Sequence, residues 1–175
     1  RTHRRGNQSP QRDGIGIVTK VLYVEHNDDN IYMLKTRLEL LGGFEVLAAG
    51  DSESGCELAV TEHPDVILMD LEMPVVDRWE PVRRLRNDPH TRDIPIIGMS
   101  AHALESEREQ AIATGCDEFD AKPIEFDSLV ATIRRVLAHP KEALINAAMR
   151  PFAASRRTFF LSKPPAHSGR RERMA

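Results

Sequence analysis

Apolar runs alternate with amphipathic segments through the middle of the chain, and this alternation constrains the fold more than any other feature of the sequence. Residues 65–70 (DVILMD) and 94–100 (IPIIGMS) are apolar almost throughout, as strands covered by helices on both faces must be. Further strands are predicted at residues 21–25, 44–50 and 117–121. Strands that alternate with helices pair in parallel through right-handed crossovers. The pattern predicts an α/β fold, a doubly wound (βα)5 sandwich around a five-stranded parallel sheet.

Helical patterns separate and follow these strands, at about residues 29–42, 52–62, 79–87, 103–114 and 125–138. The first helix is predicted to bury Ile31, Leu34, Leu38 and Leu41, and the last to bury Phe126, Leu129, Ile133, Val136 and Leu137. We expect Asp28 and Asp29 to form the negatively charged start of the first helix, with Asp28 as a candidate cap, and the Gly42-Gly43 pair to form its left-handed end. Asp51 or Ser52 is expected to cap the second helix.

The net charge of −3 conceals a strong asymmetry. Residues 17–138 carry a net charge of −12, whereas residues 1–16 carry +3 and residues 139–175 carry +6. We therefore divide the chain into a basic N-terminal tail (1–18), one compact domain (19–138) and a basic C-terminal tail, which we expect to begin as a short helix and then to be disordered. Since an acidic domain repels phosphates, nucleic acid is not an expected partner of the domain.

The sequence contains no run of about 18 apolar residues, and its first residues lack the apolar segment of a secretory signal. These features predict no contact with a membrane and a cytoplasmic location. The only cysteines, Cys56 and Cys116, lie far apart in the sequence, so they are expected to be free thiols, buried or half-buried.

Polar residues follow the predicted strands where function gathers in doubly wound folds, beyond the carboxyl ends. They are Glu25, His26, Asp70, Ser100 and Lys122. This set suits phosphoryl chemistry, with Asp70 as a carboxylate nucleophile and with Ser100 and Lys122 binding the phosphoryl oxygens. Closely packed carboxylates repel one another, so a divalent cation or Lys122 must neutralise them.

Four motifs occur in order: VLYVEHNDDN, DVILMDLEMPVVDRWE, IPIIGMSAHA and GCDEFDAKPIEF. Together they resemble the receiver domain of response regulators, over about residues 20–138, and in particular the receivers of chemotaxis. The resemblance implies a flavodoxin-like sheet in which the strands lie in the order 2-1-3-4-5. It also implies that Asp70 is the phosphoacceptor and that Ser100 and Lys122 bind the phosphoryl group.

The resemblance assigns further roles around Asp70. A magnesium ion would be bound by Glu25, position 26, Asp70 and the backbone carbonyl of Glu72. Ser100 would move inward on phosphorylation, and Phe119 would rotate inward with it as an aromatic switch. Glu72 and His102 occupy the two positions that tune the lifetime of the phosphoryl group.

His26 departs from the family pattern, which places an acid at this position. Magnesium prefers oxygen ligands, and imidazole is a poor substitute. Three alternatives stay open. Asp70 is phosphorylated with a weakened metal site, helped by Asp28 or Asp29; the site is degenerate and the domain binds its partner without phosphorylation; or His26 is a true ligand that shifts the preference to manganese or another transition metal.

Arg78 is the second departure, because receivers usually carry glycine there. Either arginine is strained in a positive-φ turn, or the loop adopts another conformation. Arg78 would also tune the site if it placed a positive charge beside Asp70. We hypothesise that His26 and Arg78 partly replace the cation. An unchanged magnesium affinity after His26→Asp and Arg78→Gly would contradict this hypothesis.

The sequence predicts a stand-alone response regulator with no enzymatic activity beyond self-phosphorylation from small donors and autodephosphorylation. Its phosphodonor would be a sensor histidine kinase or a phosphotransfer protein that docks beside the first helix. The face around the fourth helix, fifth strand and fifth helix would contact a downstream protein, and this face also suits a homodimer. The alternatives are a phosphorylation-independent pseudo-receiver adaptor and, less favoured, a DNA-binding regulator that uses the basic tail.

Overall fold

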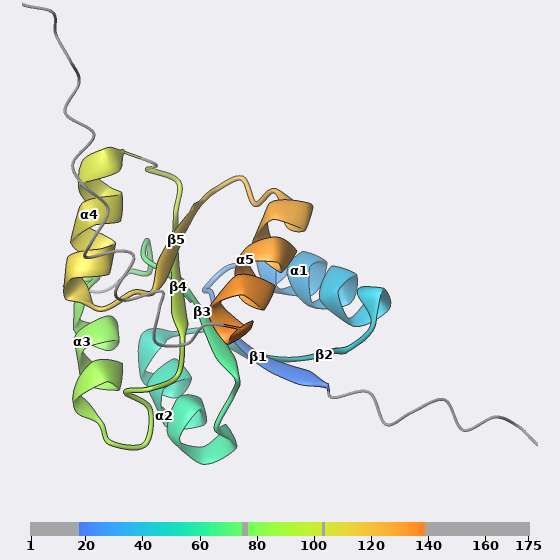
Figure 1. The fold of residues 1–175 in the computed structure, drawn as a ribbon, viewed down its shortest axis with the longest axis horizontal. Coiled ribbons are helices and arrows are strands. Elements are labelled where there is room, and N and C mark those ends of the chain that lie inside the picture. The colour runs from blue at the N-terminus through green and yellow to red at the C-terminus, as the bar shows by residue number, and fades with distance from the viewer. Residues whose placement is uncertain (1–17, 75–76, 103, 139–175) are drawn as a thin grey trace, which may run out of the picture.

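The computed structural model describes residues 18–74, 77–102 and 104–138 (Figure 1). Its strands are β1 (Thr19–Val24), β2 (Phe44–Ala49), β3 (Val66–Asp70), β4 (Ile96–Ser100) and β5 (Glu118–Ala121). Its helices are α1 (Asp28–Leu41), α2 (Ser52–Glu62), α3 (Glu80–Asn87), α4 (Glu105–Thr114) and α5 (Phe126–Ala138). Each predicted strand and helix is present, with its ends within two residues of the prediction. The tails fall outside the described residues, apart from Val18.

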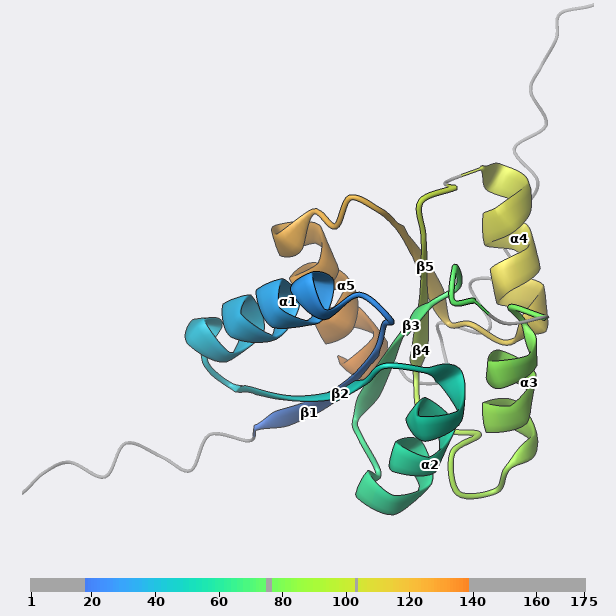
Figure 2. The same ribbon diagram turned by 180° about the vertical axis from the view of Figure 1, so that it is seen from behind.

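All strands pair in parallel in the order β2-β1-β3-β4-β5, which confirms the predicted doubly wound topology. Helices α1 and α5 cover one face of the sheet, and α2, α3 and α4 cover the other (Figures 1 and 2). Every residue of β3 and β4 is buried. This explains why both strands are apolar almost throughout, since neither has a face toward water.

The ends of the helices follow their local sequence with two corrections. The side chain of Asn27, not that of Asp28, caps α1 by accepting hydrogen bonds from the backbone N–H groups of Asp29 and Asn30. Asp28 and Asp29 both lie in the first turn, as predicted, where their charges interact favourably with the helix dipole. Gly42 ends α1 with a φ of 82°, so the predicted positive φ is confirmed, but its ψ of 153° lies outside the left-handed helical region that was predicted.

The predicted inner faces of the helices are largely confirmed. Leu34 and Leu38 are buried on α1, and Leu129, Ile133 and Val136 are buried on α5. Three of the other predicted residues, Ile31, Phe126 and Leu137, are partly buried against the same core. Leu41 is 49% exposed, so its predicted burial is wrong. It is the last residue of α1.

The register of the sheet brings the carboxyl ends of four strands together. Asp70 pairs with Met99, and Ser100 pairs with Ala121, so the ends of β3, β4 and β5 are level. Val24, the last residue of β1, pairs with Met69, which places Glu25 beside Asp70. Within the described ranges, no helix is long and apolar enough to cross a membrane.

Candidate phosphorylation site

Two buried carboxylates and one lysine meet at the carboxyl edge of the sheet. Lys122 Nζ lies 2.8 Å from Glu25 Oε2 and 3.0 Å from Asp70 Oδ2. Both carboxylate side chains are fully buried, so the lysine supplies the charge that lets them pack side by side. These two ion pairs raise the pKa of Lys122, although burial by itself would lower it. The structure thus brings together three of the predicted site residues.

Glu25 is held by many donors. Its carboxylate accepts hydrogen bonds from the Tyr23 hydroxyl at 3.1 Å, the Asn27 backbone N–H at 3.0 Å, the Asn30 side chain at 3.2 Å and Lys122. Burial would raise the pKa of Glu25, but the bonds from Lys122 and from the two asparagines lower it below its ordinary value. Glu25 is therefore a fixed anion with a defined orientation.

Tyr23 and Asn30 were not predicted to belong to the site. Tyr23 lies within the apolar run of β1, and its hydroxyl reaches Glu25 two residues later because alternate side chains share one face of a strand. Asn30 lies in the first turn of α1. Only the path of the chain after β1 turns its amide toward Glu25.

Asp70 is satisfied on one side only. Its Oδ1 accepts a hydrogen bond from the backbone N–H of Glu72 at 2.9 Å. Its Oδ2 is buried and has no hydrogen-bond partner among the described residues, because Lys122 is close but not aligned as a donor. Burial, reinforced by the nearby Glu25 charge, raises the pKa of Asp70 in spite of Lys122. Oδ2 thus has an ionic partner in Lys122 but no well-aligned hydrogen-bond donor among the described residues.

His26 lies beside Asp70 Oδ2. Its Nδ1 lies 3.3 Å from Glu25 Oε1 and 3.5 Å from Asp70 Oδ2, and its side chain is 47% exposed. The three residues offer one ligand atom each, all within 4.8 Å of one another. Two carboxylate oxygens and one imidazole nitrogen fit a divalent cation. This donor set suits manganese or another transition metal better than magnesium.

Ser100 is buried at the end of β4 and faces two more carboxylates. Its Oγ lies 3.1 Å from Glu107 Oε2 and 3.3 Å from Glu72 Oε1. Glu72 also contacts His102 Nδ1 at 2.6 Å. Burial would raise the pKa of Glu72, but the interaction with His102 lowers it. The two residues predicted to tune the site are therefore in contact beside Ser100.

A sequence profile described as the response regulator receiver domain matches residues 21–134. The chain belongs to this family. Receiver domains generally bind magnesium at an acidic site and interact with histidine kinases or phosphotransfer proteins and with downstream targets. The chain is accordingly a receiver-domain response regulator of two-component signalling.

Known relatives and solved structures agree with this assignment. The polar-differentiation response regulator DivK of Brucella ovis is 32% identical over 117 residues, which are 67% of this chain and 94% of DivK. The receiver domain of a sensor histidine kinase from Pseudomonas aeruginosa, with a magnesium ion coordinated in its active-site cleft, is 30% identical with a TM-score of 0.63. That match covers 69% of this chain and 98% of the solved chain.

A chemotaxis receiver has a similar fold. The chemotaxis protein CheY4 of Vibrio cholerae is 27% identical with a TM-score of 0.63, over 68% of this chain and 98% of that one. Both solved structures thus match the described part of this receiver domain over nearly their whole length.

Phe119 lies on β5 of the receiver domain, next to Gly98 of β4. It is partly buried and packs against the core between the sheet and α2, α3 and α4. Its backbone carbonyl accepts a hydrogen bond from Arg108 of α4 at 3.4 Å. This backbone contact connects the strand that precedes Lys122 with α4, and the role of the ring as an aromatic switch stays a prediction.

Arg78 does not pair with Asp70. Its Nη1 lies 3.1 Å from Glu107 Oε1, and its guanidinium lies 5.7 Å from the centre of the Trp79 ring. Among the described residues other than glycine, only His63 has a positive φ, so Arg78 is not strained. The loop has adopted another conformation, as one of the two alternatives predicted.

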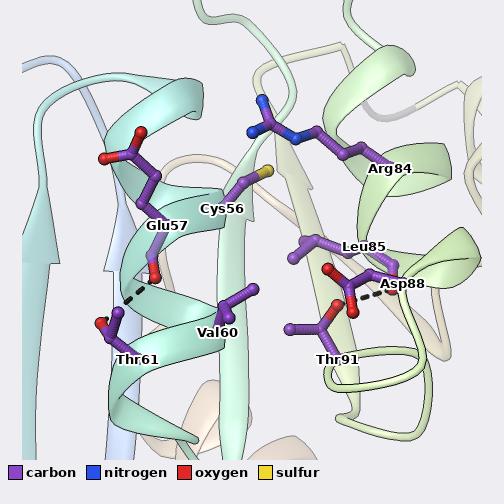
Figure 3. Close-up of a pocket in the computed structure, with 8 residues that line it drawn as sticks. All are labelled: Cys56, Glu57, Val60, Thr61, Arg84, Leu85, Asp88 and Thr91. Carbon is purple, nitrogen blue, oxygen red and sulfur yellow. Dashed lines mark hydrogen bonds between the residues drawn. The ribbon is translucent and has the colours of Figure 1, made fainter.

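A hollow of about 310 Å³ opens between α2 and α3 (Figure 3). Its lining consists of Cys56, Glu57, Val60, Thr61, Arg84, Leu85, Asp88 and Thr91. None of these belongs to the site at the carboxyl edge. Cys56 and Cys116 are both buried free thiols, as predicted, and burial raises their pKa values to about 11 and about 12.

Proposed function

We propose that this receiver domain accepts a phosphoryl group on Asp70 from a histidine kinase or a phosphotransfer protein and signals through contact with another protein. The observation that carries the proposal is the buried Asp70 carboxylate, whose Oδ2 lies 3.0 Å from Lys122 Nζ but accepts no well-aligned hydrogen bond in the described structure. Buried polar atoms with incomplete hydrogen bonding are uncommon, and a catalytic or ligand-binding role is one of their explanations. Lys122 and Ser100 lie at the same edge of the sheet to receive the new group.

In the proposed reaction, the Asp70 carboxylate attacks the phosphorus atom of a phosphohistidine. A P–O bond to Asp70 forms as the P–N bond breaks, and the imidazole leaves with the bonding electron pair and takes up a proton. The product is an acyl phosphate. Lys122 keeps its positive charge next to the phosphoryl oxygens, and the Ser100 hydroxyl donates a hydrogen bond to one of them.

A divalent cation bound here would neutralise the charge that develops on the transferred group. We propose that Glu25, Asp70, His26 and the Glu72 carbonyl would hold it. His26 brings one nitrogen to a site that magnesium would fill with oxygen, so we expect weak magnesium binding and relatively stronger manganese binding.

Intact-mass measurement tests this function directly. The protein is incubated with acetyl phosphate in magnesium, in manganese and in EDTA, with Asp70→Asn as the matched control. We expect one adduct of about 80 Da, the mass of one phosphoryl group, that depends on the cation and is absent from Asp70→Asn. Absence of the adduct with acetyl phosphate and with a phosphorylated phosphotransfer protein would reject phosphorylation.

A second candidate function is that of an adaptor that works without phosphorylation. It is favoured by His26, which offers a cation a nitrogen in place of the usual oxygen, whereas Asp70, Ser100 and Lys122 favour the phosphorylated switch. In that case Asp70→Asn would leave partner binding unchanged. A partner that binds only the phosphorylated protein would exclude the adaptor.

We further propose that the protein works in the cytoplasm as a stand-alone regulator and that the face formed by α4, β5 and α5 carries its output. On this face, Glu118 lies 3.4 Å from Arg108 and 3.0 Å from Arg135, so one strand residue links the two helices. The same face would mediate a homodimer. Glu118→Lys should weaken both partner binding and any dimer, as measured by light scattering.

DNA binding through the C-terminal tail remains the less favoured alternative. The tail lies outside the described residues, and the described domain is acidic. If the tail acts in this way, removing residues 139–175 should abolish binding to duplex DNA in a mobility-shift assay.

A further inference from the structure

Glu107 links three elements around the Ser100 hydroxyl. It lies in the first turns of α4, and its Oε2 lies 3.1 Å from Ser100 Oγ. Its other oxygen, Oε1, lies 3.1 Å from Arg78 Nη1, just before α3. We call Arg78, Glu107 and Ser100 the Glu107 bridge. Neither Glu107 nor this connection follows from the sequence motifs.

The Ser100 hydroxyl can donate only one proton at a time. In the described structure it faces Glu107 at 3.1 Å and Glu72 at 3.3 Å, and its oxygen accepts a hydrogen bond from the His102 backbone N–H at 3.0 Å. A carboxylate acceptor makes a stronger hydrogen bond than a neutral one. Any new acceptor, such as a phosphoryl oxygen, must therefore compete with Glu107 for the same proton.

Arg78 makes this competition specific to the chain. Its guanidinium holds the second oxygen of Glu107 while the side chain of Glu107 is only 20% exposed. A glycine at position 78, as most receivers carry, would leave Glu107 without this partner. Arg78 therefore fixes the carboxylate that occupies the Ser100 hydroxyl.

We propose that Glu107, held by Arg78, is a positioning residue that retains the Ser100 hydroxyl in the unphosphorylated protein and releases it when Asp70 is phosphorylated. Release frees the first turns of α4 from Ser100 and so carries the signal to the proposed output face. This inference rests on the proposed phosphorylation of Asp70. The Glu107 bridge therefore opposes activation, because phosphorylation of Asp70 must break the contact between Ser100 and Glu107.

The first arm of the test needs no phosphorylation. Urea unfolding is measured for the full chain, Ser100→Ala, Glu107→Ala and the double variant. If the hydrogen bond is direct, the effect of the double variant on the unfolding equilibrium constant should differ by about threefold to tenfold from the product of the two single effects. Effects that multiply would overturn the contact. If Glu107→Ala does not fold, Glu107→Gln replaces it in the cycle.

The second arm measures release. Beryllofluoride, which mimics a phosphoryl group on a carboxylate, is titrated in magnesium and in manganese, and the fluorescence of Trp79, the only tryptophan, reports binding. Glu107→Ala should bind about threefold to tenfold more tightly than the natural chain, and Arg78→Gln should shift in the same direction by less. Glu105→Gln is the matched control on the exposed side of α4 and should match the natural chain.

The two arms separate the failure of the bridge from the failure of the proposed function. Unchanged or weaker binding by Glu107→Ala, while the natural chain binds beryllofluoride, would overturn the release. If neither the natural chain nor the variants bind beryllofluoride, phosphorylation fails as the function and the release fails with it. The unfolding cycle still decides in that case whether Glu107 holds Ser100.

Discussion

Charged side chains form a cluster at each end of the sheet, and the two clusters differ in how completely their atoms are hydrogen-bonded. The amino-end cluster consists of Arg86 and Asp117, whose side chains lie 2.7 Å apart. Arg86 also donates to the backbone carbonyls of Gly115, Arg92 and Ile94. The carboxyl-end cluster, formed by Glu25, Asp70 and Lys122, leaves Asp70 Oδ2 without an aligned donor.

The direction of the aspartate pKa shift is the same in both clusters, so it does not distinguish them. Burial raises the pKa of Asp117 as it raises that of Asp70. The difference lies in the partners, because Asp117 Oδ2 accepts from both Arg86 and the Ile96 backbone N–H at 2.7 Å. A buried charge with complete partners fixes the fold, whereas one with an open position is available for chemistry.

The backbone around the amino-end cluster is shaped to receive Arg86. Gly115 has a φ of 129°, and a Cβ added there would lie 2.8 Å from Arg86 Cγ. Glycine therefore provides both the backbone conformation and the space for the arginine stem. This close fit indicates that the amino-end cluster contributes mainly to stability.

The largest expected effect is the loss of Arg86. Arg86→Ala leaves Asp117 buried without its cation and should lower the free energy of unfolding by about 3–5 kcal/mol in urea denaturation. Arg83→Ala is the control on the same helix, since Arg83 pairs with Asp77 at the surface and should cost less than about 1 kcal/mol. Similar losses in both variants would show that the amino-end cluster is not a stabilising one.

A matched pair of Asp→Asn variants compares the two clusters directly. Asp117→Asn should cost about 2–3 kcal/mol, because Arg86 loses its carboxylate inside the protein. Asp70→Asn should change the free energy of unfolding by less than about 1 kcal/mol, since Lys122 keeps Glu25 as its partner at 2.8 Å and the loss of a buried charge offsets the lost ion pair. Urea denaturation measures both. Equal costs would remove the distinction between the clusters.

Metal affinity sharpens the comparison at the carboxyl end. His26→Asp supplies the missing oxygen ligand and should tighten magnesium binding about tenfold, with a smaller gain for manganese. Calorimetric titration measures both affinities. His90→Asp, at an exposed histidine after α3, makes the same change in charge away from the site and should have no effect. An unchanged magnesium affinity in His26→Asp would show that imidazole does not limit the site.

The smallest effect concerns Cys116, which is buried beside the amino-end cluster. Its pKa is raised to about 12 by burial, so the thiol stays protonated in the folded protein while it ionises above about pH 9 in the unfolded chain. The unfolded state therefore gains stability as the pH rises, and none of this effect is present at pH 7. Between pH 8 and pH 10 the natural chain should lose about 1 kcal/mol more than Cys116→Ala.

Urea denaturation at both pH values measures this difference. If the two proteins lost stability equally, Cys116 would be reached by water or base in the folded state. The amino end would then be more open than its complete hydrogen bonding indicates.

Strands and helices could be predicted because their signals are local. The apolar residues of β3 and β4 by themselves indicate strands that are covered on both faces. Gly42 by itself indicates the end of α1. The sequence offers Asp28 as a candidate cap because an acid before a helix often is one, but the chain after Glu25 places Asn27 at that position. The residue types around the start of a helix do not determine its first residue to within one position.

The predicted site residues assemble for a topological reason. In a parallel sheet, the carboxyl ends of adjacent strands share one edge, so residues that follow the strands meet whatever their distance in sequence. That argument brings Glu25, Asp70, Ser100 and Lys122 together, as observed. It is silent on residues such as Glu107, which reach the edge from a helix.

The sequence by itself determined the order of the elements, the covered strands and the identity of the groups at the carboxyl edge, because these depend on periodicity and on strand ends. Only the tertiary structure decided which charges are satisfied. In the structure Arg78 pairs with Glu107, and Asp70 Oδ2 has no well-aligned hydrogen-bond donor. Neither could be predicted, because a hydrogen bond depends on distances and angles between segments that are far apart in the sequence.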